Sequence, residues 1–243
     1  MTACHLAAVK GNLEVYDTLC YWAKETGLNP CDNLRKKIEK RFTVPHTAAQ
    51  GNNADILQKM CELVEERLVN PNSGDKKGYT AWFRAAQGGN LQALELIYFW
   101  VKEGELNTDE LLLAQNEERN SALHIAARKN HVGMLQQLWD WAENGQQNPN
   151  QLRKSLLQAK DNNFFTAWHH AALNGSSEAL EKIVDFVIES ELSADELLLA
   201  KGENEVTAFH MAAKRKHVRI LQKLWVWPET TQQNPQELKK IYF

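Results

Sequence analysis

A seven-residue segment recurs six times along the 243-residue chain, and this repetition constrains the fold more than any other feature. Ser121 to Ala127 reads SALHIAA, and its counterparts read TACHLAA, TVPHTAA, TAWFRAA, TAWHHAA and TAFHMAA. The copies begin near residues 2, 43, 80, 121, 166 and 207. Regular self-similarity at this period is typical of repeat architectures, in which stacked units share one continuous core. We therefore expect one elongated array over residues 1–243 rather than one large core or two domains.

The residues after each motif predict a helix stop and then a second helix. The residue nine positions past the motif start is Gly or Asn in five units and Lys in the sixth. These residues are Gly11, Asn52, Gly89, Asn130, Gly175 and Lys216. Gly and Asn tolerate the left-handed conformation that ends helices, so we predict a stop in five units. A run with helical spacing follows, as from Val132 to Ala142.

An Asn-Pro step in four units predicts a third, short helix. Asn148-Pro149 is one example, because Asn favours the N-cap and Pro the first helical position. We expect this helix to span Pro149 to Ala159, with counterparts in most units. The second unit is the exception, since NPNSGDKKGYT predicts a loop.

All eight tryptophans fall on three repeated positions. Counted from the motif start as zero, these are positions 2, 18 and 20: Trp82, Trp168, Trp139, Trp225, Trp22, Trp100, Trp141 and Trp227. Other units place Cys, Val, Leu, Phe or Tyr there, with Pro45 as the one residue not typical of a core, so we interpret them as packing positions. A ligand-stacking aromatic cage is the alternative.

Neither histidines nor cysteines form a recognisable site. His124, His169 and His210 share motif position 3, but stacked units would hold them about 10 Å apart, too far to share one metal ion. Cys4, Cys20, Cys31 and Cys61 contain no CxxC pair and indicate a reducing, intracellular setting. We expect Cys20 and Cys61 in the core and Cys31 exposed.

Composition and motifs exclude several functions. The net charge of -3 argues against nucleic acid as the partner. The sequence contains no apolar run of about 18 residues, so it predicts no membrane span. Phosphate loops, GxSxG, HExxH, Cys-His couples and EF-hand loops are absent from the sequence. We expect no enzyme activity, no metal and no cofactor.

The motif, the Gly/Asn turn, the second helix and the entry turn DKKGYT together resemble the ankyrin repeat. The resemblance implies an all-α helical solenoid with short entry turns, here with an extra third helix in most repeats, and a motif histidine that binds the backbone between neighbouring units. Two departures stand out. Ankyrin units have about 33 residues, and these are longer. The turn glycine before the motif survives only as Gly78, with Arg119, Phe164 and Glu205 elsewhere, so we expect distorted entry turns in the later units.

By the resemblance, a partner protein would bind the concave face, which the entry turns and the first helices form. The positions that map there include Lys76, Lys77, Tyr79, Glu117, Glu118, Arg128, Lys129, Phe164, Phe165, Glu203, Lys214 and Arg215. Phe164 and Phe165 are adjacent aromatics at a turn tip, and aromatic residues are enriched in interface hot spots. The alternative is that Phe164 folds down onto the next turn.

Neither end of the chain resembles a polar terminal cap, which solenoids need. We therefore expect a segment of a longer array whose uncapped ends leave self-association open. The leading hypothesis is a protein-binding scaffold in an intracellular, cytoplasmic setting. The alternative is the recognition segment of a larger enzyme or toxin, such as an effector that an intracellular bacterium delivers to its host's cytoplasm.

Overall fold

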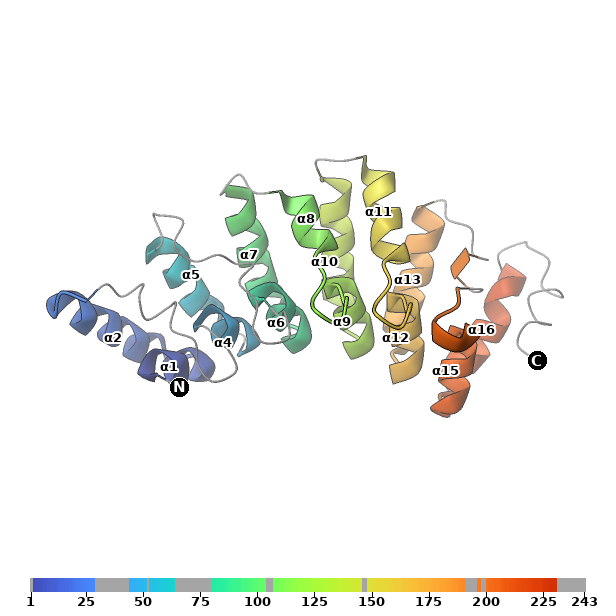
Figure 1. The fold of residues 1–243 in the computed structure, drawn as a ribbon, viewed down its shortest axis with the longest axis horizontal. Helices are drawn as coiled ribbons and strands as arrows, with labels where there is room; N and C mark the ends of the chain where they lie inside the picture. Colours follow the sequence, from blue (N-terminus) through green and yellow to red (C-terminus); the bar gives the residue numbers. More distant parts are fainter. Residues whose placement is uncertain are drawn as a thin grey trace. The chain divides into compact units, whose positions relative to one another are not determined.

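The computed structural model describes residues 2–28, 44–51, 53–63, 80–103, 107–145, 148–190, 196–197 and 200–230. These residues form helices joined by turns, and no strand occurs among them, so the predicted all-α fold is confirmed (Figure 1). The chain divides into two compact units, Met1–Glu117 and Glu118–Phe243. The single continuous array stays a prediction.

The described residues of the first unit form three helix pairs and one short extra helix. The pairs are α1 (Ala3–Lys10) with α2 (Leu13–Glu25), α4 (Val44–Gln50) with α5 (Ala54–Leu63), and α6 (Ala81–Gly88) with α7 (Leu91–Glu103). The short helix α8 (Thr108–Leu113) packs on α7. The Asn107 side chain caps α8 by accepting hydrogen bonds from the backbone N–H groups of Asp109 and Glu110.

The second unit repeats this plan. Its pairs are α9 (Ala122–Lys129) with α10 (Val132–Glu143), α12 (Ala167–Asn174) with α13 (Ser177–Glu189), and α15 (Ala208–Lys214) with α16 (Val218–Thr230). Between them lie α11 (Pro149–Gln158) and the 3-10 turn η1 (Glu203–Glu205). The predicted third helix is confirmed in α11, which Asn148 caps and which begins at Pro149.

The first helix of each pair, here called the inner helix, packs against the inner helix of the next pair: α1 on α4, α4 on α6, α9 on α12 and α12 on α15. The paired alanines of the motif make this possible because their small side chains are buried at the contact, as Ala126 and Ala127 are in α9. The inner helices end in left-handed residues, as predicted, at Gly11, Gly89, Asn130 and Gly175. Lys216 also adopts this conformation (φ 60°), so the helix stop extends to the unit without Gly or Asn. Asn52 lies outside the described residues.

In four repeats, a hydrogen bond from the residue ten positions after the motif start joins the repeat to the preceding inner helix. Asn90 Nδ2 donates to the carbonyls of Ala49 and Gln50 at 2.5 and 3.2 Å. His217 Nε2 donates to the Leu173 carbonyl at 3.1 Å, Ser176 Oγ to Arg128, and Asn53 to Ala8. These carbonyls lie at helix C-termini and lack partners within the helix, so each bond satisfies a group that would otherwise need water. We call these bonds the carbonyl clamps.

Burial confirms the packing role of five tryptophans and contradicts it for two. Trp82, Trp139, Trp168, Trp141 and Trp227 are buried, Trp100 is half-buried, and Trp22 and Trp225 are 59% and 37% exposed. The reason is the direction in which each position points. Position 20 faces the preceding pair and position 18 the following one, as the stacked rings of Trp139 and Phe186 show. No described helix precedes Trp22 or follows Trp225, so no described helix covers either indole on that side.

Cys4 and Cys20 are buried free thiols, as expected for Cys20. Cys31 and the side chain of Cys61 lie outside the described residues.

Candidate protein-binding surface

The turns that precede α9, α12 and α15 are joined through their main chains. The backbone N–H of Asn162 donates to the Glu118 carbonyl at 3.1 Å, and the N–H of Glu203 donates to the Asn163 carbonyl at 2.7 Å. Each of the later two turns is also closed internally, by Asp161 N–H to the Phe165 carbonyl and by Gly202 N–H to the Val206 carbonyl. The three turns therefore form one fixed strip along the edge of the unit. We call it the turn strip.

The expectation of distorted turns is wrong before α9 and α12. Arg119 and Phe164, which replace the family's glycine, have φ values of 58° and 62° and thus keep the left-handed conformation that glycine would adopt. Only the turn before α15 differs, because Asn204 as well as Glu205 is left-handed there. A left-handed bulky residue costs about 1–2 kcal/mol, so the turn shape is retained at a steric cost.

The two adjacent phenylalanines have different environments. Phe164 is 57% exposed at the tip of its turn. Phe165 is half-buried, with its ring 5.5 Å from that of His169 and so close to Gly202 that a Cβ atom there would come within 2.0 Å of it. The alternative in which Phe164 folds down is therefore wrong: Phe165 packs on the next turn and Phe164 faces solvent.

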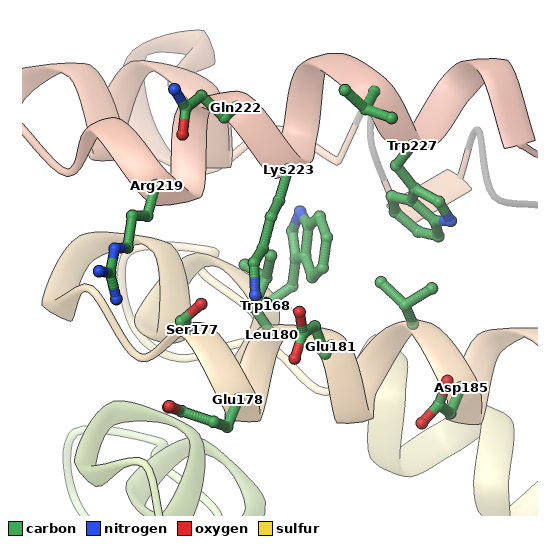
Figure 2. Close-up of a pocket in the computed structure, with 12 residues that line it drawn as sticks. Trp168, Ser177, Glu178, Leu180, Glu181, Asp185, Arg219, Gln222, Lys223 and Trp227 are labelled. Carbon is green, nitrogen blue, oxygen red and sulfur yellow. Dashed lines mark hydrogen bonds and ion pairs between the residues drawn. The ribbon is translucent and has the colours of Figure 1, made fainter.

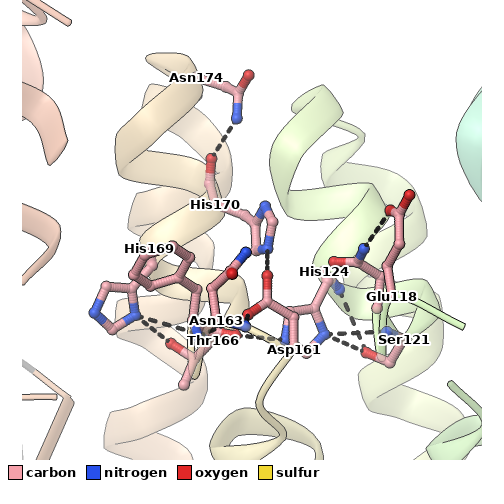
Figure 3. A network of polar contacts seen from close by, with 11 residues as sticks. Glu118, Ser121, His124, Asp161, Asn163, Thr166, His169, His170 and Asn174 are labelled. Carbon is pink, nitrogen blue, oxygen red and sulfur yellow. Dashed lines mark hydrogen bonds and ion pairs between the residues drawn. The ribbon is translucent and has the colours of Figure 1, made fainter. Parts of the chain in front are cut away.

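A buried pair that the sequence did not predict fixes this turn from inside (Figure 3). One oxygen of Asp161 accepts from the backbone N–H groups of Asn163 and Phe165 at 2.8 and 2.9 Å. The other accepts from His170 Nε2 at 3.0 Å. The only hint in the sequence was that His170 is the one histidine outside the repeat pattern.

Burial and hydrogen bonding shift the pKa values of Asp161 and of two nearby histidines. Burial raises the pKa of Asp161, but hydrogen bonds from His170 and from the backbone of Phe165 and Asn163 outweigh it, so the pKa lies below its usual range. Burial, aided by repulsion from His170, lowers the pKa of His124 to about 4. Burial likewise lowers the pKa of His169 to about 4. Both histidines are therefore neutral at pH 7.

The neutral histidines carry out the role that the repeat motif predicts. His124 Nε2 donates to the Phe165 carbonyl at 3.1 Å, and His169 Nε2 donates to the Ala200 carbonyl at 2.9 Å. Their Nδ1 atoms accept from the backbone N–H groups of Ser121 and Thr166. Each histidine therefore links the start of its own inner helix to the next turn.

The charged residues predicted for binding lie at two separate places in the second unit. Glu118 and Glu203 are exposed on the turn strip, at the N-terminal ends of the inner helices. The cations lie at the opposite ends, where Lys129, Lys214 and Arg215 are exposed and Arg128 is half-exposed. An eight-residue helix at 1.5 Å per residue separates the two groups by about 12 Å.

The remaining predicted residues lie elsewhere. Glu117 is exposed at the end of the first unit. Lys76, Lys77 and Tyr79 lie outside the described residues.

Comparison with known proteins supports the interpretation of the repeats. Residues 46–150 match a family model for ankyrin repeats, described as three copies. This stretch of the chain thus matches ankyrin repeats. The count of six repeats stays a prediction.

Similar solved structures share the ankyrin fold at low sequence identity. The ankyrin repeat domain of human ASB11 superposes with a TM-score of 0.64 at 19% identity, covering 96% of this chain and 85% of that one. A chain of the complex between the Bd0816 predatory endopeptidase from Bdellovibrio bacteriovorus and the immunity protein Bd3460 gives a TM-score of 0.64 at 20% identity, covering 92% of this chain and 97% of that one.

A curated relative is much longer than this chain. Alpha-latrotoxin-Lh1a from Latrodectus hasselti is 30% identical over 154 residues, which are 63% of this chain and 10% of that protein. The chain thus spans about a tenth of the curated relatives it matches.

The described residues contain no helix that is long and apolar enough to cross a membrane. They also contain no group of three His, Cys, Asp or Glu side chains placed to hold a metal ion.

Proposed function

We propose that the chain is a non-catalytic protein-interaction module whose partner binds the turn strip and the inner helices, the concave face of an ankyrin array. The observation that carries this proposal is Phe164. It is a large apolar side chain, 57% exposed, in a strained backbone conformation at the tip of a turn that buried hydrogen bonds hold in place. Strained residues of this kind cluster at functional sites.

The surroundings of Phe164 also suit a protein partner. A rigid aromatic anchor loses little conformational entropy on binding, and aromatic residues are enriched among hot spots. Exposed carboxylates at Glu118 and Glu203 lie on the neighbouring turns, and cations lie across the inner helices. Opposite charges arranged in separate rows favour one orientation of a partner and steer its approach.

The test compares Phe164→Gly with Arg119→Gly in affinity capture from the native cell, followed by affinity measurement with the purified partner. Both residues are left-handed and hold the same place in consecutive turns, so both changes relieve the same backbone strain. Only the first removes an aromatic side chain. We expect Phe164→Gly to weaken binding at least tenfold, as loss of a hot spot of about 2 kcal/mol would, and Arg119→Gly to leave the phenylalanine anchor intact.

A partner that binds both variants and the original chain equally would reject Phe164 as the anchor. Binding that is lost on Arg128→Ala with Arg215→Ala but kept in Phe164→Gly would assign the partner to the far ends of the inner helices instead.

A second candidate function is that this chain is the recognition segment of a larger toxin or effector. The 30% sequence identity with part of alpha-latrotoxin-Lh1a favours it, as does the structural likeness to a chain of an endopeptidase–immunity protein complex. Sequencing the reading frame on both sides of these residues tests this candidate. A flanking catalytic or toxin domain would support it, and flanking ankyrin repeats alone would reject it.

A further inference from the structure

Positive charge is concentrated around the turn between α15 and α16. Residues 206–228 contain no Asp or Glu, although the whole chain has a net charge of -3. The cations of this segment are Lys214, Arg215, Lys216, Arg219 and Lys223. The first three are consecutive, and all three are exposed at the turn.

Carboxylates balance only the two cations that lie within α16. Figure 2 shows Arg219 and Lys223 directed from α16 toward α13, where Glu178 and Glu181 lie. Lys223 forms an ion pair with Glu181. A hydrogen bond from Asn130 lowers the pKa of Glu178, and the charges of Lys223 and Arg219 lower it further. By contrast, no carboxylate of the described residues forms an ion pair with the three consecutive cations of the turn.

The turn that carries these three cations has a fixed backbone. The N–H groups of Lys216 and His217 donate to the carbonyls of Ala213 and Ala212 at 3.0 and 2.9 Å. The carbonyl clamp of His217 also joins the turn to the end of α12. The next residue, Val218, is apolar and 60% exposed. The turn therefore presents cations beside an aliphatic side chain, and its fixed backbone loses little entropy when a partner binds.

The carbonyl clamps align this turn with the corresponding turns of the two preceding pairs. Ser176 donates to the Arg128 carbonyl as His217 donates to the Leu173 carbonyl, so the ends of α9, α12 and α15 lie along one edge of the second unit. The turn after α12 has no charged residue between positions 173 and 177. The turn after α9 carries two more cations that form no ion pair with a described residue. We call the whole set the basic edge, and it consists of Arg128, Lys129, Lys214, Arg215 and Lys216.

The spacing of the basic edge suits an extended chain. Packed helices lie about 8–10 Å apart, so the two basic turns, which are two helices apart, are separated by about 20 Å. An extended chain of about six residues covers this distance.

The basic edge fits an acidic protein segment better than a nucleic acid. Unpaired bases bind by stacking on aromatic side chains, and residues 128–131 and 214–218 contain no Phe, Tyr or Trp. The chain's net charge of -3 also opposes a long polyanion. A short acidic segment with one apolar residue complements both the cations and Val218.

We propose that the basic edge binds an acidic segment of a partner protein, about six residues or longer, whose carboxylates contact the two basic turns and whose apolar side chain packs on Val218. This inference rests on the proposed function, because it specifies the chemistry of the partner. It concerns the ends of the inner helices opposite the turn strip, about 12 Å from it.

The test titrates the full chain into rhodamine-labelled peptides and follows their fluorescence anisotropy. The acidic peptide is EELEELEE, and QQLQQLQQ is its uncharged counterpart. We expect only the acidic peptide to bind at low ionic strength. Its affinity should fall as salt is raised to about 150 mM, because salt screens interactions between exposed charges.

Two matched double variants locate the site. Lys214→Gln with Arg215→Gln should weaken binding of the acidic peptide about 3- to 10-fold, the effect of losing two exposed charge contacts. Lys10→Gln with Lys24→Gln removes the same charge from exposed residues of the first unit and should leave the affinity unchanged. Phe164→Gly should also leave it unchanged, which separates this test from the test of the aromatic anchor.

Absence of binding by the acidic peptide, equal binding of both peptides, or an equal loss in the two double variants would overturn the proposal. An oligonucleotide of eight thymidines that binds more tightly than the acidic peptide would also overturn it, because the edge would then be a nucleic-acid site. None of these outcomes bears on Phe164, whose role as an anchor is decided by capture of the partner.

Discussion

The fold gives Phe164 a backbone conformation that a bulky side chain disfavours. The turn requires a left-handed residue, the family supplies glycine there, and this chain places a phenylalanine at φ 62°. Main-chain bonds to the neighbouring turns and the Asp161 carboxylate hold the turn in this shape. The steric cost at Phe164 is thus offset by bonds that residues on either side of it make.

We predict that Phe164→Gly raises the free energy of unfolding by about 1 kcal/mol, because glycine adopts this conformation without the steric penalty. The exposed phenyl ring has little packing to lose. Urea denaturation monitored by circular dichroism measures the change. Phe165→Gly is the matched control, and it should lower stability because Phe165 packs against Gly202. A lower stability for Phe164→Gly would show that its ring has a packing role.

The sequence predicted residue roles well where a role depends on the unit alone. Left-handed stops, the Asn148 cap and the histidine links all follow from the repeat. The exposure of a side chain could not be predicted from the repeat, because it depends on the neighbouring pair of helices. Trp139 and Trp225 share one repeat position, yet α13 covers Trp139 and no described helix follows Trp225. The Asp161–His170 pair escaped prediction for another reason, since it occurs in one turn and leaves no periodic trace.

At the scale of elements, the inner helices α9 and α12 depend on neutral histidines at their N-termini. Each histidine accepts at Nδ1 from its own helix start and donates at Nε2 to the next turn. Protonation at Nδ1 would replace that acceptor with a donor. The same ring therefore links two elements only while it carries one proton.

We predict that the protein loses stability as the pH falls from 7 to 5. His124 and His169 have pKa values of about 4 in the fold and about 6.5 when unfolded, so the unfolded chain binds more protons in this window. Linkage then removes about 2 kcal/mol for each histidine by pH 5. Asp161 adds no loss there, because a lowered carboxyl pKa matters only below about pH 4.

Urea unfolding at pH 7, 6 and 5 measures this dependence, and His124→Gln should remove about half of it. A glutamine amide can still donate to the Phe165 carbonyl without taking up a proton. Stability that does not change between pH 7 and 5 would contradict the buried, neutral state of both histidines.

At the scale of the whole molecule, two tryptophans at packing positions of the repeat are exposed. Trp22 on α2 and Trp225 on α16 occupy positions that are buried where another pair lies alongside. Trp22 occupies the repeat position that faces a preceding pair, and Trp225 occupies the one that faces a following pair. Complementary surfaces of this heterologous kind join copies head to tail.

We predict concentration-dependent self-association through these faces. Sedimentation velocity should show the average mass rising with concentration, and Trp22→Glu with Trp225→Glu should abolish the rise, because a charge in such a contact is costly to desolvate. Ile188→Glu, at another exposed apolar position of the second unit, is the control and should leave association unchanged. A strictly monomeric original chain would reject this prediction.

The carbonyl clamps have a mechanical consequence. Each clamp joins a pair of helices only to the preceding pair, as His217 joins α16 to the end of α12 and Ser176 joins α13 to the end of α9. A force applied along the second unit therefore loads the clamps in series rather than together. The weakest one yields first, the chain it releases lengthens, and the tension drops before the next yields. Such a unit extends under load in steps, each the length of one repeat.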